Sequence, residues 1–160
     1  MRTLKQHLEQ AQNHIKHHGS VSPALIVECK DGKALVFIFA DFPDGIDKHK
    51  LIFGVGRKVA EMKEFGPVEK IILTTEAWAK SFPKDADLSE FRSGEKRVVD
   101  FADKVEIVIS TSLDVNSKAE ILSTDFIRSG KYIDFSKPKK LTATAGDVMI
   151  LKRFWEGYLI

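Results

Sequence analysis

One stretch near the N-terminus decides the fold class: Ala24-Leu-Ile-Val-Glu-Cys-Lys-Asp-Gly-Lys-Ala-Leu-Val-Phe-Ile-Phe-Ala40. Its two apolar segments, residues 24–29 and 33–42, have strand composition, and the Asp31-Gly32 pair between them is typical of a tight hairpin turn. Because residues 34–40 are apolar at consecutive positions, both faces of the second strand are expected to be covered. The stretch therefore predicts a β-hairpin whose second strand is central in a sheet.

Amphipathic helices are predicted on both sides of this hairpin. Before it, residues 3–18 carry an apolar stripe from Leu4 to Ile15, with Thr3 as a plausible N-cap and Gly19 as the stop. After it, residues 46–65 carry so broad an apolar face that contact with the sheet and with another helix is expected.

Two glycines interrupt the second helix. Gly56 lies on its buried side, where close approach of another backbone explains the missing side chain. Gly54 lies on the polar side, and the pattern offers no account of it.

The rest of the chain adds strands and a final helix. Residues 68–75 are predicted to form a central strand that closes a β–α–β unit, and a long polar loop follows. Residues 105–113 alternate as a half-buried strand, residues 118–128 and 131–135 form a second hairpin, and an aromatic helix closes the chain.

The predicted fold class is α+β in a single domain spanning residues 1–160. A mixed, mainly antiparallel five-stranded sheet packs with about three helices. The order is α-β-β-α-β-β-β-β-α, in which one short segment is left open as a strand.

Composition excludes several functional classes. There are 25 Lys and Arg residues against 23 Asp and Glu, so the net charge of +2 gives no strong nucleic-acid signal. The single Cys29 excludes an internal disulfide and a cysteine zinc cage. The N-terminus lacks the apolar core of a secretory signal, and no apolar run is long enough for a bilayer. We therefore expect a soluble, cytoplasmic protein without a membrane partner or a cofactor.

Glu28 and Lys30 are the first candidates for chemistry. A carboxylate and a lysine two apart on a strand point to the same side, as in many metal-dependent nucleases. Such sites also need a further acid on an adjacent strand, and no Asp precedes the pair. A metal-dependent nuclease or hydrolase is therefore the alternative hypothesis.

Histidines on the first helix are the second candidate. His14 and His18 have the i, i+4 spacing that can chelate a metal ion. They lack an intervening Glu, and cationic side chains near a helix C-terminus are favoured by the helix dipole in any case. No metal site is predicted.

The favoured hypothesis is a non-enzymatic binding or protein-interaction domain, with enzymatic activity left open. Its predicted binding residues are Glu76, Trp78, Phe82 and Arg92, at the end of the strand over 68–75 and in the polar loop that follows. Trp and Arg are frequent anchors of interaction surfaces, and loops beyond strand ends often carry ligand groups. The partner is left open as another protein or a second copy of the chain.

Overall fold

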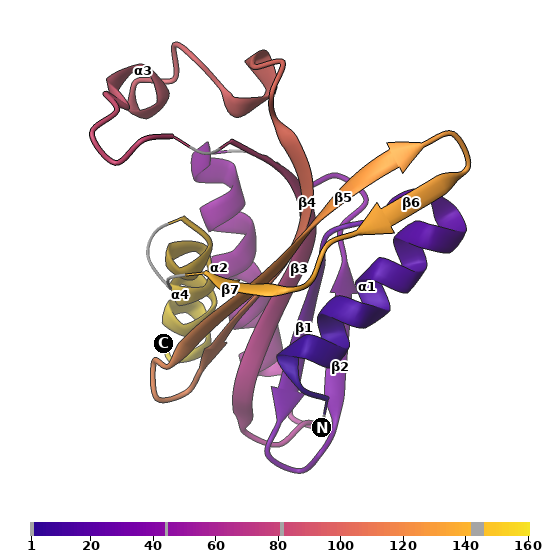
Figure 1. Cartoon of the computed structure of the whole chain (residues 1–160). Helices are drawn as coiled ribbons and strands as arrows, with labels where there is room; N and C mark the ends of the chain where they lie inside the picture. The colour runs from indigo at the N-terminus through magenta and orange to yellow at the C-terminus, as the bar shows by residue number, and fades with distance from the viewer. Residues whose placement is uncertain (1, 44, 81, 142–145) are drawn as a thin grey trace.

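The computed structural model describes residues 2–43, 45–80, 82–141 and 146–160, without the side chains of Phe91, Arg92 and Asp147 (Figure 1). Its elements in chain order are α1 (Leu4–His18), β1 (Ala24–Cys29), β2 (Ala34–Ile38), α2 (Gly45–Glu61), β3 (Val68–Ala79), α3 (Ser89–Arg92), the 3-10 helix η1 (Val98–Asp100), β4 (Val105–Asp114), β5 (Ala119–Ser129), β6 (Tyr132–Phe135), β7 (Lys139–Leu141) and α4 (Gly146–Tyr158). None of the helices in these ranges is long and apolar enough to cross a membrane.

The predicted α+β class is confirmed. The strands form one sheet in the order β2-β1-β3-β4-β5-β6, with β7 also paired to β5, and all paired neighbours are antiparallel. Because β1 lies between β2 and β3 and is antiparallel to both, β2 and β3 run parallel and α2 connects them. The sheet has seven strands where five were predicted, partly because Lys139–Leu141 is too polar to read as a strand.

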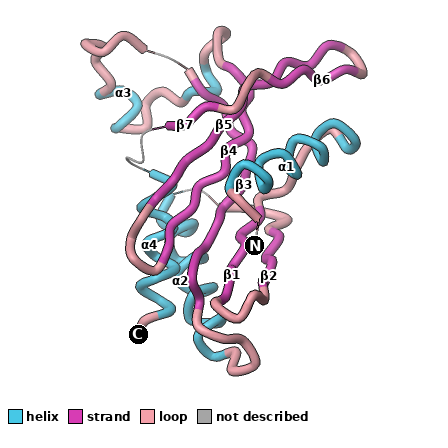
Figure 2. The backbone as a smooth tube through the Cα atoms, turned by 60° about the horizontal axis from the view of Figure 1, so that its bottom comes forward, coloured by secondary structure: helices cyan, strands magenta, loops and turns pink. Residues whose placement is uncertain are grey.

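The predicted central position of β2 is wrong. This strand is at the edge of the sheet, paired to β1 alone among the strands described (Figures 1 and 2). Leu35 and Phe37 pack against the core, but Val36 and Ile38 on the other face are 59% and 70% exposed. Both faces of β2 are apolar, as the sequence shows, but only the face with Leu35 and Phe37 is covered.

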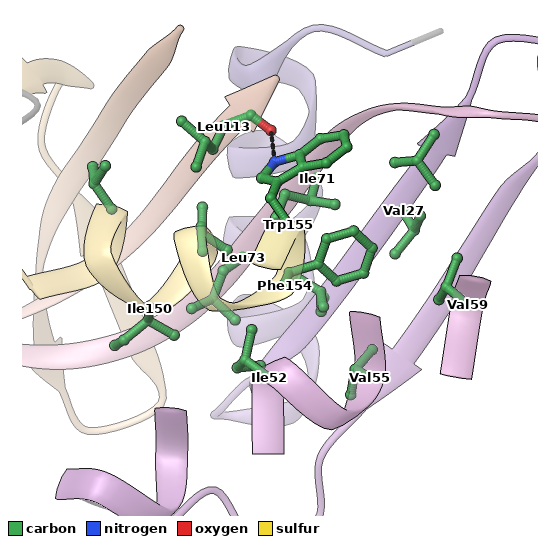
Figure 3. Packing of buried hydrophobic residues seen from close by; sticks show 14 of the residues in the cluster. Val27, Ile52, Val55, Val59, Ile71, Leu73, Leu113, Ile150, Phe154 and Trp155 are labelled. Carbon is green, nitrogen blue, oxygen red and sulfur yellow. Dashed lines mark hydrogen bonds between the residues drawn. The ribbon is translucent and has the colours of Figure 1, made fainter. Parts of the chain in front are cut away.

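On the first face of the sheet, α2 and α4 cover the main core (Figure 3). Phe154 is fully buried there, and Trp155 Nε1 donates a hydrogen bond to the carbonyl oxygen of Leu113 at 3.3 Å. The free thiol of Cys29 also lies in this core, and its burial raises the pKa of the thiol.

On the opposite face, α1 packs against β4, β5, β3 and β6. Leu8 and Ile15 are fully buried on this side with Val108 and Phe126. Thr3 closes a capping box with Gln6, and Gly19 ends the helix in the left-handed region at φ 85°. Both ends of α1 therefore lie where the sequence predicts them. The helix leaves β2 uncovered on this face of the sheet.

Candidate functional site

A groove of about 510 Å³ lies on the uncovered part of the sheet, between α1 and the outer strands β1 and β2. We call it the α1–β2 groove. Its apolar wall consists of Ala11, Val21, Ala24, Ile26, Ala34, Val36 and Ile38. Its polar lining consists of Arg2, His7, Gln10, His14, Ser22, Glu28, Gly32, Lys33 and Thr74. Most of the exposed lining surface is apolar although polar residues contribute to it, and a cavity of this size and composition is typical of a small-molecule site.

The pairing register of the first hairpin builds the floor of the groove. Ala24 lies opposite Ile38, Ile26 opposite Val36, and Glu28 opposite Ala34. Because alternate residues of a strand share a face, all six side chains lie on the α1 side of the sheet. Five of these six residues are apolar and Glu28 is the charged one, while on the other side of β1 Lys70 of β3 is paired with Glu28.

Glu28 is held by His7 of α1. The Nε2 atom of His7 lies 3.1 Å from Oε1 of Glu28, and the two residues are only 6% and 3% exposed. His7 Nδ1 and Glu28 Oε2 are buried and make no hydrogen bond within the part of the chain that the structure describes. An unsatisfied buried polar atom costs about 1–3 kcal/mol, and more for a charged group, so this pair calls for an explanation.

The mouth of the groove is basic. Arg2 and Lys33 both line it. The Arg2 guanidinium donates to the side chain of Gln10 on α1, and Lys33 Nζ lies 3.9 Å from Asp31 and 3.5 Å from the carbonyl oxygen of Glu64. Two cationic side chains therefore contribute to the lining of the groove.

Glu76, the first of the predicted binding residues, takes part in an ion-pair cluster. Arg128 Nη2 lies 3.4 Å from Glu76, and its Nε lies 2.9 Å from Glu106. The same guanidinium donates to the carbonyl oxygen of Gly19 at 2.7 Å, and Val21 N–H donates to Glu76 at 3.4 Å. The cluster therefore ties the end of α1 and the segment after it to the sheet.

The environment of Glu76 also changes its acidity. Burial raises the pKa of its carboxyl group, and the negative charge of Glu106 raises it further. The Val21 N–H donor and the charge of Arg128 act in the opposite direction without cancelling that rise.

Trp78 and Phe82 lie farther along the same part of the chain. The strand β3 runs to Ala79 instead of ending near Thr75, so Glu76 and Trp78 belong to the strand and share its α1 face. Trp78 is 44% exposed, with Lys104 Nζ at 5.1 Å from its ring centroid. Phe82 packs edge-on against Phe101 at 5.9 Å.

The segment that holds Phe82 stands apart from the α1–β2 groove, with α3 projecting beyond the end of the sheet (Figure 1). The side chain of Arg92 lies outside the described residues. The structure therefore places Glu76 in a structural cluster and Trp78 on an exposed surface. It does not gather the predicted residues into one cavity.

The residues of the alternative hypothesis are separated. Glu28 lines the groove, but Lys30 lies in the hairpin turn with an exposed side chain and does not line it. Rings of His14 and His18 contact each other at 4.5 Å between centroids, and His14 Nδ1 lies 2.9 Å from the carbonyl oxygen of Ser20. Across the described ranges, no three His, Cys, Asp or Glu side chains cluster in a way that could hold a metal ion.

Sequence reasoning missed the groove because it treated the apolar outer face of β2 as covered. Two signals could have located it. The face with Val36 and Ile38 is as apolar as the face with Leu35 and Phe37. In addition, His7 interrupts the edge of the apolar stripe on α1, and a histidine there needs a polar partner when it is buried.

The function has to be argued from this geometry alone. Comparison of the chain with models of known protein families, with curated proteins and with solved structures gives no significant match in any of the three.

Proposed function

We propose that the protein is a non-enzymatic binding protein whose ligand lies in the α1–β2 groove. The observation that carries this proposal is an apolar groove of about 510 Å³ whose inner wall holds a buried pair, His7 and Glu28, with two unsatisfied polar atoms. Exposed apolar surface combined with a few convergent polar groups is the usual composition of a ligand site.

The lining also defines the chemical class of the ligand. Val36 and Ile38 favour an apolar body, because their exposed surface gains free energy when it leaves water. Glu28 lines the groove, and a carboxylate can only accept hydrogen bonds, so it favours a ligand with an N–H or O–H donor. Arg2 and Lys33 at the mouth favour a neutral or anionic outer end. The proposed ligand is a small amphipathic molecule that enters with its donor group first.

Fluorescence titration with N-phenyl-1-naphthylamine tests this proposal, because that probe is apolar and carries one N–H donor. We expect saturable binding at one site per chain. Replacing Ile38 by Thr removes apolar contact while keeping the β-branched shape, so the affinity should fall by about 1 kcal/mol, roughly fivefold.

Ile127→Thr provides a matched control, since Ile127 is 67% exposed on β5 and does not line the groove. It should leave the affinity unchanged. Equal losses in both variants, or fluorescence that rises without saturating, would show that the probe binds exposed apolar surface in general.

A hydrolase is the second candidate, on the single observation that His7 lies 3.1 Å from Glu28 inside a cavity. A histidine beside a carboxylate can act as a general base toward a bound water or hydroxyl group. This candidate predicts turnover of small apolar esters that disappears in Glu28→Gln. A rate equal in the wild-type protein and that variant would remove it.

A further inference from the structure

We propose that two copies of the chain pair through β2, edge to edge and antiparallel, so that the two sheets become one continuous sheet. The proposal rests on the backbone of β2 and on the other edge of the sheet. It does not rest on a ligand in the groove.

The first observation is the direction of the backbone groups in β2. Cys29 N–H donates to the carbonyl oxygen of Lys33, and Phe39 N–H donates to that of Pro23, so these odd-numbered residues point their backbone groups toward β1. In an antiparallel ladder the alternate residues point the other way. Ala34, Val36 and Ile38 therefore direct three N–H and three C=O groups away from the sheet.

The second observation is that β2, although it has only five residues, lacks the other features that usually protect an edge. Natural edge strands are short, charged, bulged or interrupted by proline. β2 reads Ala-Leu-Val-Phe-Ile, with neither a charge nor a proline, and its register with β1 is regular. An apolar strand of this kind is a template for pairing with another strand.

The opposite edge of the sheet shows the contrast. There β5 is bordered by β6, which has four residues, and by β7, which has three. β7 carries Lys139 and Lys140, both exposed, and Lys139 Nζ lies 3.5 Å from Asp125. One edge thus carries charged strands, while β2 is neutral and apolar and has no second partner strand among those described.

A second copy fits this edge because β2 is self-complementary. Antiparallel pairing about a two-fold axis at Val36 places Val36 opposite Val36 of the second copy and Ala34 opposite its Ile38. In this register all three outward-facing residues pair with outward-facing residues, which allows six backbone hydrogen bonds. If either strand is displaced by two residues, one of the three outward-facing residues has to pair with Gly32 or Ala40, which lie outside β2.

Charges at the ends of the strand agree with an antiparallel arrangement. Lys30, Asp31 and Lys33 precede the strand and carry one net positive charge, while Asp41 follows it. Antiparallel pairing brings the positive end of each copy to the negative end of the other, whereas parallel pairing would join like ends.

Cysteine cross-linking tests both the partner and the register. Directly opposite residues in a hydrogen-bonded pair lie about 5.5 Å apart at Cα, within the range of a disulfide. Val36→Cys should therefore give a covalent dimer on mild oxidation. In Ile38→Cys the two thiols lie four residues apart along the strands, about 14 Å, which is too far for a disulfide.

The wild-type protein is the control for Cys29, which is buried and should not cross-link. Cross-linking of Val36→Cys alone supports the proposed register. Equal cross-linking of both variants, or of neither, overturns it.

A second measurement remains informative if a cysteine variant folds poorly. Val36→Pro removes only an outward-facing N–H, so the bonds between β1 and β2 stay intact. In sedimentation velocity the wild-type protein should shift from monomer to dimer with rising concentration, whereas Val36→Pro with an unchanged circular dichroism spectrum should stay monomeric. A wild-type monomer at every concentration, or a dimer that Val36→Pro leaves unchanged, contradicts the proposal.

Discussion

Glu28 is the residue whose environment is hardest to explain by folding alone. It is paired with Ala34 of β2 and Lys70 of β3, and Ile26 and Val36 follow it along the groove floor. A buried ion pair is often no more stabilising than two apolar side chains of similar volume, while loss of one partner is costly. The proposed function gives the His7–Glu28 pair a role in binding.

A double-mutant cycle tests that role. His7→Leu and Glu28→Met alone should each lower the free energy of unfolding by about 3 kcal/mol, because each leaves a buried polar group without its partner. The combined variant should return to within about 1 kcal/mol of the wild-type protein in urea unfolding, yet bind N-phenyl-1-naphthylamine more weakly. If the double variant instead loses as much unfolding free energy as the two single variants together, the pair has a structural role.

Glu76 gives a second prediction at this scale, through pH. Its pKa is raised in the folded state, so folding favours the protonated form, and stability is lost as the pH rises from the ordinary carboxyl range through the folded-state pKa. Glu76→Gln should therefore be more stable than the wild-type protein at neutral pH. The difference should vanish in acid, where Glu76 is itself neutral.

Thermal unfolding measured across that pH range checks the sign of the effect. A Gln variant that is less stable at neutral pH would mean that attraction to Arg128 outweighs burial and the repulsion from Glu106.

At the scale of elements, the contact between α2 and α4 depends on two glycines. A Cβ atom at Gly56 would lie 2.1 Å from the carbonyl oxygen of Phe154, and one at Gly157 would lie 2.2 Å from that of Phe53. The two helices therefore touch backbone to backbone where they cross. This confirms the expected role of Gly56, whereas a Cβ atom at Gly54 would meet nothing within 4 Å.

Alanine at these positions should have opposite effects. Gly56→Ala should destabilise the protein by about 1–3 kcal/mol or more, because backbone atoms cannot move aside as a side chain does. Gly54→Ala is the matched control, because it makes the same change two residues away in α2 where the added Cβ atom meets nothing within 4 Å. It should stabilise the protein by about 0.4–1 kcal/mol through helix propensity. Urea unfolding of both variants measures the difference, and similar effects of the two would contradict the crossing.

Local signals made most of the elements predictable. Thr3 and Gly19 bound α1 because capping depends on a few neighbouring atoms, and Asp31-Gly32 and Ser129-Gly130 mark the two hairpins for the same reason. The end of β3 was not predictable, because Thr75–Ala79 continues as a strand only through its pairing with β4. Pairing partners are distant in sequence, and residue pattern does not reveal them.

At the scale of the whole molecule, the candidate site depends on how far α1 extends over the sheet. The sequence identifies α1 and both faces of β2, but it does not say which strands α1 covers. In the structure α1 packs on β4, β5, β3 and β6, and a groove lies on the part of the sheet that α1 leaves uncovered. His7 and Glu28 are 21 positions apart, so their contact exists only in the folded chain.

The most direct test of the groove as a ligand site is methyl NMR during titration with N-phenyl-1-naphthylamine. The account predicts saturable shifts confined to methyl groups that line the groove, above all those of Ile26, Val36 and Ile38. The equally exposed methyl groups of Ile127 and Leu159 should not move. Shifts spread over all exposed apolar residues, or centred on any other surface, would contradict the account.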